Sequence, residues 1–490
     1  MPIQLDMFGS TWTPGAAPAL LTDLRTGLAL TRTELGLATA RFYRAIGEPA
    51  PSTRIAIEAK HDLVDVIAIL SCLRYGLTSI PVDPLLGPRA VAHIMDQTAP
   101  VVAILADTRT KVAQACVDMK FDPGSTDADE NLMFSGSSLA MLLYTSGTTG
   151  KPKGVMFSRQ QISFIVETLA GVLEYCPLTK VHSRLPLTFD YGIFQIFLAA
   201  IFDQELQLAH RLTPMESQAT LVREPDESVV LPIVPRMGSA LIAAAKRRRE
   251  FATSVALVTS TGERLASSIA DELQIVYPRA RIQPMYGLTE CMRVSVGPPF
   301  RGTRPDSRAV GRALPGTQVR VCDDGGRELP RGEVGEIRIR GPHVSSGYWS
   351  EEGPPDGACL GHGGGRELRS GDLGFQMLDG ELCVIGRRQD GVIKHRGHRV
   401  SLHEVDAVAG ELSNFGDAAS IANSDRIHVF YTGPISPDKA EEHLLSALGP
   451  LYAPIIAHHL PELPVNARGK LDRAMLEHLA DDSKACDNNA

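Results

Sequence analysis

A loop rich in hydroxyl groups, glycines and lysines has the composition needed to bind a polyphosphate. Residues 145–154 read TSGTTGKPKG, and apolar segments flank them on both sides. Glycines let the backbone approach an anion closely, hydroxyl groups donate hydrogen bonds, and lysines neutralise charge. The P-loop of common nucleoside triphosphatases is excluded, because its spacing would require glycine at position 145 and serine or threonine at position 152. Those positions hold Thr145 and Pro152.

Further motifs follow this loop in order along the chain. Residues 261–264 read TGER, residues 286–290 read YGLTE, and residues 370–374 read SGDLG. Together with the loop they resemble the AMP-forming adenylating enzymes, a superfamily that includes acyl-CoA synthetases, adenylation domains of nonribosomal peptide synthesis and luciferases. The resemblance extends from about residue 80 to Arg473, which is most of the chain. It implies an AMP-forming ligase that uses ATP and releases pyrophosphate.

The resemblance also implies how these motifs would hold ATP. Tyr286 would stack beside the adenine, Asp372 would accept hydrogen bonds from both ribose hydroxyls, and Thr289 would contact the α-phosphate. Glu290 would hold Mg²⁺, which prefers oxygen ligands and usually takes only one or two protein carboxylates. An ionised carboxylate also suits the ribose role of Asp372. The other ATP contacts that the resemblance implies are Thr145, Ser146, Gly147, Thr148, Thr149, Gly150, Lys151, Lys153, Gly262, Glu263 and Gly287.

A hinge motif, GRRQDGVIKHRG, begins at Gly386 and resembles the family's Gly-Arg-x-Asp followed by Ile-Lys-x-x-Gly. The spacing departs from the family pattern by one residue. Anchored on Gly397, the motif makes Asp390 the hinge residue and Arg388 the ribose-binding arginine. Anchored on Gly386, it makes Arg387 that arginine. Either arginine could reach the ribose.

The last motif, LPVNARGKLDR at residues 463–473, resembles the family's final motif and places its lysine at Lys470. By that resemblance Lys470 would act with Thr289 and Glu290 in catalysis. Its cation would bridge the substrate carboxylate and the α-phosphate, and would stabilise the pentacoordinate phosphorus of the transition state. After adenylate formation, the small domain would swing about its hinge so that a thiol can attack the adenylate.

The acid pocket is set partly by residues 186–194, which read PLTFDYGIF. Acyl-CoA synthetases commonly have histidine where this chain has Phe189, whereas Phe-Asp is similar to amino-acid adenylation domains. In those domains the aspartate pairs with the substrate's α-ammonium group, so Asp190 is a candidate amine binder. The alternatives are a structural cap and a contact with a neutral ligand. Arg293 could pair with a second carboxylate, pair with Asp190, or face solvent or the domain interface. Apolar walls are expected from Tyr191, Phe194 and Met285.

The function predicted is activation of an amino acid, or a similar small carboxylic acid, followed by transfer to the phosphopantetheine thiol of a separate carrier protein. Residues 396–400, 450–454 and 469–473 resemble peptide-synthetase adenylation domains more than acyl-CoA synthetases. Because the chain ends soon after, a free-standing enzyme is expected. The alternatives are a ligase that uses free CoA, and a catalytically silent nucleotide-binding scaffold.

The fold class predicted is α/β. Short β-branched runs such as 53–57 and 255–258 alternate with helical patterns, which indicates buried, mainly parallel sheets. Residues 1–389 are expected to form a large N-terminal domain of such sheets flanked by helices, with a half-exposed β subdomain marked by the alternation at 336–340. Residues 390–490 are expected to form a small, mobile α+β C-terminal domain.

Bulk properties indicate a cytoplasmic enzyme without nucleic-acid or membrane partners. The net charge of −8 argues against general nucleic-acid binding. The basic run at residues 246–249 is expected to be the exposed end of a helix. Eight cysteines without a C-x-x-C pair indicate reduced thiols. No signal peptide is evident, and apolar stretches such as 64–73 are too short to span a bilayer.

Overall fold

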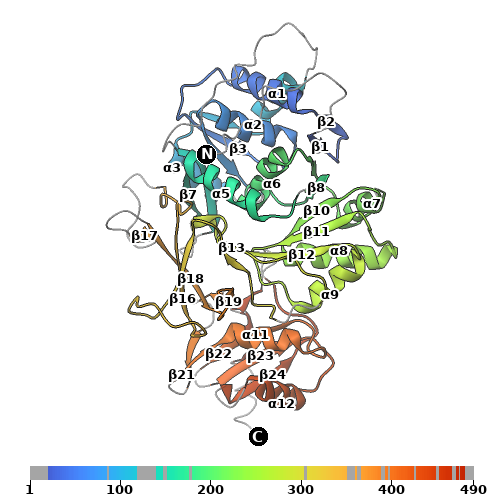
Figure 1. The fold of residues 1–490 in the computed structure, drawn as a ribbon, viewed down its shortest axis with the longest axis vertical. Helices are drawn as coiled ribbons and strands as arrows, with labels where there is room; N and C mark the ends of the chain where they lie inside the picture. Colours follow the sequence, from blue (N-terminus) through green and yellow to red (C-terminus); the bar gives the residue numbers. More distant parts are fainter. Residues whose placement is uncertain are drawn as a thin grey trace.

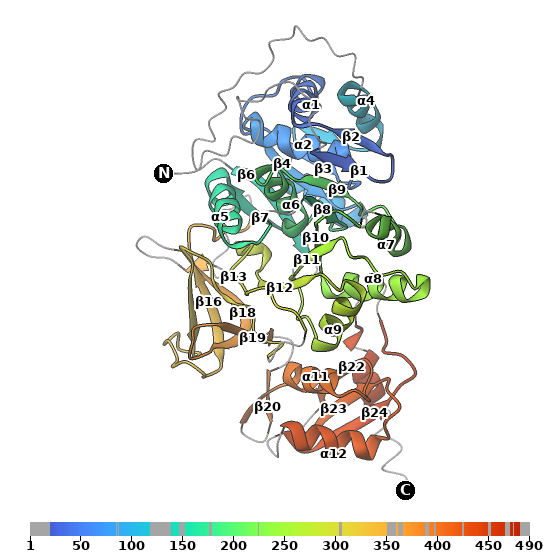
Figure 2. The same ribbon diagram turned by 45° about the vertical axis from the view of Figure 1, so that its right-hand side comes forward.

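The computed structural model shows a large multi-sheet body with a smaller unit at its C-terminal end (Figure 1). The first helices and strands lie at one end of the long axis, and the smaller unit lies at the other end (Figure 2). The structure describes residues 20–84, 86, 88–117, 139–146, 152–175, 179–223, 225–302, 306–349, 359–360, 366–387, 392–395, 398–423, 426–448, 452–465, 471–473 and 475–480.

The first sheet has five strands in the order β5-β3-β4-β6-β7. The pairs β3–β4, β3–β5 and β4–β6 are parallel, whereas β6 and β7 form an antiparallel pair. This sheet and its helices use β3 Arg54–Glu58, β4 Thr78–Val82, β5 Val102–Ile104, β6 Leu139–Ser146, β7 Pro152–Ser158, α1 Arg32–Ala45, α2 Leu63–Arg74, α3 Pro88–Thr98 and α4 Ala106–Val117. All five residues of β4 are buried, as expected of a parallel strand that is covered on both faces.

The second sheet has nine strands in the order β14-β13-β12-β11-β10-β8-β9-β1-β2. Its central pairs are parallel and its two edges are antiparallel, so the prediction of mainly parallel sheets is confirmed. Its strands are β1 Leu21–Asp23, β2 Leu28–Leu30, β8 Lys180–Ser183, β9 Glu205–Leu208, β10 Val229–Ile233, β11 Val255–Ser260, β12 Arg281–Tyr286, β13 Ser295–Val296 and β14 Arg312–Ala313. The accompanying helices are α6 Asp190–Ile201, α7 Pro214–Arg223, α8 Pro235–Arg248 and α9 Ser267–Val276, and α5 Arg159–Val172 contacts both α6 and β7 of the first sheet.

The predicted β subdomain is a separate antiparallel sheet in the order β15-β16-β18-β17, with β19 also paired to β18. Its strands are β15 Gln318–Cys322, β16 Gly335–Arg340, β17 Cys359–Leu360, β18 Glu367–Gln376 and β19 Leu382–Arg387. The sequence of β16 alternates between polar and apolar residues, but five of its six residues are buried, which is more than a half-exposed strand suggests. The burial of Glu336 and Arg338 is compensated by ion pairs with each other and with Arg369 and Glu367.

Within the described residues, the smaller unit contains two short sheets, the helices α11 and α12, and helical residues at 475–480, as an α+β unit does. Its elements are β20 Val392–His395, β21 His398–Ser401, α11 Leu402–Glu411, β22 Ala418–Asn423, β23 Arg426–Tyr431, α12 Pro437–Leu448 and β24 Ile455–His459. It has its own apolar core, which includes Val405, Phe415 and Leu444. Glu411, at the end of α11, accepts a 2.7 Å hydrogen bond from Arg264 of the large body. The domain boundary predicted at residues 389 and 390 lies outside the described residues.

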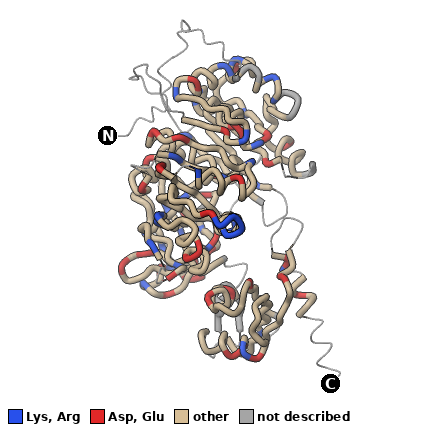
Figure 3. Tube along the Cα trace, turned by 90° about the vertical axis from the view of Figure 1, so that its right-hand side faces the viewer, with Lys and Arg blue, Asp and Glu red and all other residues tan. Residues whose placement is uncertain are grey.

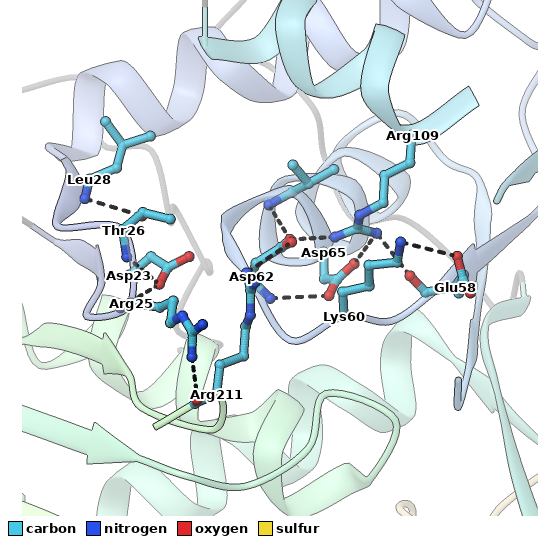
Figure 4. Close-up of polar contacts among 11 residues, drawn as sticks. Asp23, Arg25, Thr26, Leu28, Glu58, Lys60, Asp62, Asp65, Arg109 and Arg211 are labelled. Atoms are coloured by element: carbon cyan, nitrogen blue, oxygen red, sulfur yellow. Dashed lines mark hydrogen bonds and ion pairs between the residues drawn. The ribbon is translucent and has the colours of Figure 1, made fainter. Parts of the chain in front are cut away.

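A buried arginine, Arg109, joins helix α4 to the start of α2 and to the end of β3. Asp62 caps the start of α2, and Asp65, one turn inside, completes the reciprocal capping box. Figure 4 shows Arg109 reaching from α4 to both carboxylates, with Nη1 at 2.7 Å from Oδ1 of Asp65. Nη1 also donates a 2.8 Å hydrogen bond to the carbonyl oxygen of Glu58. One guanidinium thus satisfies three acceptors, and these contacts offset the cost of removing the buried charges from water.

The surface carries a basic helix end at the C-terminus of α8. Helix α8 carries Lys246, Arg247 and Arg248 in its last turn, Arg249 caps it in the left-handed conformation, and all four are exposed. This confirms the predicted basic helix end; the charge distribution is drawn in Figure 3. Of the helices within the described part of the chain, none is both long and apolar enough to cross a membrane.

Candidate active site

Strand β12 carries the YGLTE motif to the β subdomain. β12 ends at Tyr286, and a short 3-10 helix, η1 (Thr289–Cys291), follows it. Tyr286 and Leu288 pack in one apolar cluster with residues of β15, β16 and β18. Gly287 must remain a glycine, because a Cβ atom there would lie 2.2 Å from the carbonyl oxygen of Met292. The motif therefore doubles back closely on itself, and leaves Thr289 and Glu290 half-buried.

Tyr286 and Asp372 come from different sheets and meet directly. The Tyr286 hydroxyl donates a 2.5 Å hydrogen bond to Oδ2 of Asp372, and both residues are buried. The backbone of Asp372 is fixed in turn, because its N–H donates to Oγ of Ser370 at 3.0 Å. In the β18–β19 ladder, Asp372 lies opposite Arg387. The structure thus brings together the residues predicted for adenine and for ribose, and places one of the two candidate arginines beside them in the backbone register.

Glu290 has a partner that the sequence motifs did not indicate. The Tyr348 hydroxyl donates a 2.7 Å hydrogen bond to Oε1 of Glu290. The Nζ atom of Lys153, in the strand that leaves the phosphate loop, lies 5.4 Å from the centre of the Tyr348 ring. Tyr348 therefore lies between the predicted metal ligand and a predicted phosphate contact. A lone tyrosine in the segment between β16 and β17 carries no signal of this role in the sequence.

Asp190 and Arg293 form a buried pair beside this motif. Asp190 is the first residue of α6, and both side chains are at most 4% exposed. Nη2 of Arg293 lies 3.8 Å from Oδ2 of Asp190, and Nη1 donates a 2.8 Å hydrogen bond to Oγ1 of Thr261. Burial raises the pKa of Asp190 to about 6, although the charge of Arg293 opposes this shift. Arg293 therefore faces Asp190 in the protein interior and not the solvent.

The three residues predicted to form the apolar walls of the acid pocket lie in three different surroundings. The Tyr191 ring lies beneath Arg293, whose Cζ atom is 4.9 Å from the ring centre, and its hydroxyl is 2.6 Å from Oγ1 of Thr259. Phe194 is buried against Phe197 in the largest apolar core. Met285 lines a cavity with Ser260, Glu263, Pro284, Ala309 and Val310. Tyr191 is thus the wall residue in contact with the charged pair.

The segment predicted to pass beneath adenine is an exposed turn. Gly262 has a φ of +89°, a conformation that favours glycine, and is exposed. Glu263 is also exposed and lies 3.7 Å from Arg236. Thr145 lies opposite Lys153 in the β6–β7 ladder, at the base of the phosphate loop. Outside the described residues are Gly147, Thr148, Thr149, Gly150, Lys151, Arg388, Asp390 and Lys470, as are the side chains of Ser146 and Arg387.

The comparisons with known proteins identify the class to which this fold and site belong. The sequence profile of the AMP-binding enzyme family matches residues 30–349, which is more than half of the chain. The chain therefore belongs to the AMP-binding enzyme family. The prediction of an ATP-using, AMP-forming ligase of the adenylating superfamily is confirmed.

Relatives and solved structures agree with this assignment. Surfactin synthase subunit 1 of Bacillus subtilis is 26% identical over 94% of this chain, and the isonitrile lipopeptide synthase of Mycobacterium tuberculosis is 29% identical over 91%. The chain spans only 13% and 18% of these two proteins. ATP-bound MatB from Rhodopseudomonas palustris has the same fold, with a TM-score of 0.79 and 21% identity over 98% of this chain and 99% of MatB. VinN is 27% identical, with a TM-score of 0.63 over 75% of this chain and 95% of VinN.

Proposed function

We propose that this enzyme activates an amino acid as its adenylate and transfers the aminoacyl group to the phosphopantetheine thiol of a carrier protein. The observation that carries the proposal is the buried Asp190 at the start of α6. Its carboxylate lies 3.8 Å from its only ion-pair partner among the described residues, so it retains capacity for a substrate ammonium group. The similarity to peptide synthases supports an amino acid as the acid and a carrier protein as the acceptor.

The chemistry proceeds in two balanced steps. The substrate carboxylate attacks the α-phosphorus of ATP, the bond to the β-phosphate oxygen breaks, and pyrophosphate leaves with the electron pair. The carrier thiolate then attacks the acyl carbon, and AMP leaves. Lys470 would offset the charge of the two anions in the first step. Tyr286 and Asp372 would hold the nucleoside, and Thr289 would contact the α-phosphate.

Glu290 is suited to hold Mg²⁺ on the phosphates. Its carboxylate is half-buried, and Oε1 is oriented by the Tyr348 hydroxyl at 2.7 Å. An oriented, partly solvated carboxylate is the kind of single protein ligand that Mg²⁺ uses when phosphates and water complete its shell. The ion would supply neutralisation of charge on the polyphosphate. Glu290, Tyr348 and Lys153 together would position the phosphate end of the nucleotide.

The experiment that tests the proposal is pyrophosphate release with Mg·ATP across amino acids, aryl acids and short fatty acids, with hydroxylamine as the acceptor. We expect an amino acid to give the highest rate, and Asp190→Asn to lower the rate for it. Preference for an aryl or fatty acid would overturn the proposal and direct attention to CoA as the acceptor. Aminoacylation of an added phosphopantetheinyl carrier protein, compared with free CoA, then tests the second step.

A further inference from the structure

Arg293 has more hydrogen-bonding capacity than the protein uses. A guanidinium carries five N–H donors. Among the described residues, Arg293 donates one hydrogen bond, to Thr261, and its distance of 3.8 Å from Asp190 is too long for a second. Its Nε atom is buried and has no hydrogen-bond partner among the described residues. Buried donors are normally satisfied, so unused donors on a side chain only 3% exposed indicate that a bound molecule satisfies them.

The guanidinium is also held in a fixed orientation. Its Cζ atom lies 4.9 Å from the centre of the Tyr191 ring, a cation–π contact that holds one face of the arginine. Tyr191 cannot easily move, because its hydroxyl is hydrogen-bonded to Thr259 inside the second sheet. The N–H groups, which lie in the plane of the guanidinium, are thereby directed along fixed lines. A planar fork of this kind matches a carboxylate.

The position of Arg293 places it where the acid must bind. It follows Glu290 by three residues, and its hydrogen-bond partner Thr261 is the first residue of the segment predicted to pass beneath adenine. Under the proposed function the acid lies beside the α-phosphate, which Thr289 of the same motif would contact. Asp190, at the start of α6, lies 3.8 Å from Arg293. A buried positive and a buried negative side chain therefore lie next to each other, and their separation is too long for a hydrogen bond between them.

We infer that Arg293 is a second anion subsite of the acid pocket, so that the substrate is an amino acid with an acidic side chain. This inference rests on the proposed function for the role of Asp190. One carboxylate would react with ATP, the ammonium group would pair with Asp190, and the second carboxylate would take the free donors of Arg293. Arg293 and Asp190, now 3.8 Å apart, would then each form a hydrogen-bonded ion pair with the substrate in place of their one long contact. The competing arrangement is a substrate with a neutral side chain, in which Arg293 only offsets the charge of Asp190.

The test compares acids that differ only in the second charge. Pyrophosphate exchange is measured with aspartate against asparagine, glutamate against glutamine, and alanine as the truncated acid. We expect kcat/KM for one of the acidic members to exceed that of its amide by on the order of a hundredfold or more, because a site built for a charged partner rejects the analogue that leaves it unsatisfied. Equal rates for acid and amide, or preference for the amide, would overturn the inference while leaving amino-acid activation intact.

Two further comparisons separate this inference from the proposed function. Succinate and glutarate lack the amine, so a higher rate with them would support the Arg293 subsite and overturn the amine role of Asp190. Arg293→Met should reduce the acid-to-amide ratio toward one, whereas Arg247→Met, at an exposed position of α8, should leave it unchanged. Calorimetric ATP binding to Arg293→Met establishes that the variant is folded. A retained preference for the acidic substrate in that folded variant would contradict the inference.

Discussion

The hydroxyl of Tyr286 donates a 2.5 Å hydrogen bond to the carboxylate of Asp372, although 86 positions separate the two residues in the chain. One comes from the end of the second sheet and the other from the β subdomain. Their contact joins the two structural layers at the place where the nucleoside is expected. The residue predicted to stack beside adenine thus also orients the carboxylate proposed to accept the ribose hydroxyls.

Asp372→Asn tests this arrangement with little change in side-chain volume. The variant loses charge-assisted hydrogen bonds, each of which contributes about 1.5–3 kcal/mol, so ATP affinity should fall by roughly tenfold to a hundredfold. Calorimetric titration with ATP measures the change. Tyr286→Phe keeps the ring but removes the donor to Asp372, and should weaken ATP binding in the same direction and by less. Unchanged ATP affinity in Asp372→Asn would contradict its ribose role.

Tyr348→Phe tests whether the tyrosine positions Glu290 for Mg²⁺. The variant removes the 2.7 Å hydrogen bond to Oε1 but keeps the ring beside Lys153. We expect the Mg²⁺ concentration for half-maximal adenylation to rise severalfold, since a less oriented carboxylate binds the ion more weakly. ATP affinity measured in EDTA should not change. Direct binding of Mn²⁺ in the presence of ATP, followed by electron paramagnetic resonance, should weaken in parallel; equal Mn²⁺ affinity in both proteins would exclude the positioning role.

Gly287→Ala tests the close return of the chain behind the YGLTE motif. The added Cβ atom would lie 2.2 Å from the carbonyl oxygen of Met292 and 2.9 Å from Cα of Arg293. The backbone on both sides must shift, at a cost of about 1–3 kcal/mol, and adenylation should be largely lost. Gly171→Ala is the matched control, because its helical position in α5 has no atom within 4 Å of the new methyl group. That substitution should keep full activity and leave the thermal midpoint equal or slightly higher.

The sequence predicted the strands of the sheets better than it predicted which side chains contact each other in the candidate active site. Runs of β-branched residues such as 255–258 identify buried strands by local composition, and β11 forms there. The ATP motifs were found by resemblance, and their convergence at Tyr286 and Asp372 follows from the fold. The contact of Arg293 with Asp190 could not be chosen in advance, because it depends on how α6 packs against the segment after η1. Tyr348 was missed for the same reason: its partner lies 58 positions earlier in the chain.

The buried His182 should make the protein less stable as the pH falls. It lies in β8, where Nδ1 is 3.0 Å from Oε1 of Gln207 and Nε2 is 2.6 Å from Oγ of Ser217. Burial lowers the pKa of His182 from 6.5 to about 4. The unfolded chain therefore binds more protons than the folded protein between these values, so the free energy of unfolding falls as the pH drops from about 6.5 toward 4.

The shift in the pKa of His182 corresponds to about 3 kcal/mol over that range. We expect His182→Gln to be less stable than the wild type at pH 7.5, because it disturbs buried hydrogen bonds, but to lose less stability on acidification. Urea unfolding at pH 7.5, 6.0 and 5.0 measures both effects. His443→Gln, at an exposed position of α12, should follow the wild type at every pH. Parallel stability curves for His182→Gln and the wild type would show that His182 does not carry the acid sensitivity. Other histidines with lowered pKa values would then be tested, beginning with His61 and His343, whose pKa values burial lowers to about 3 and about 4.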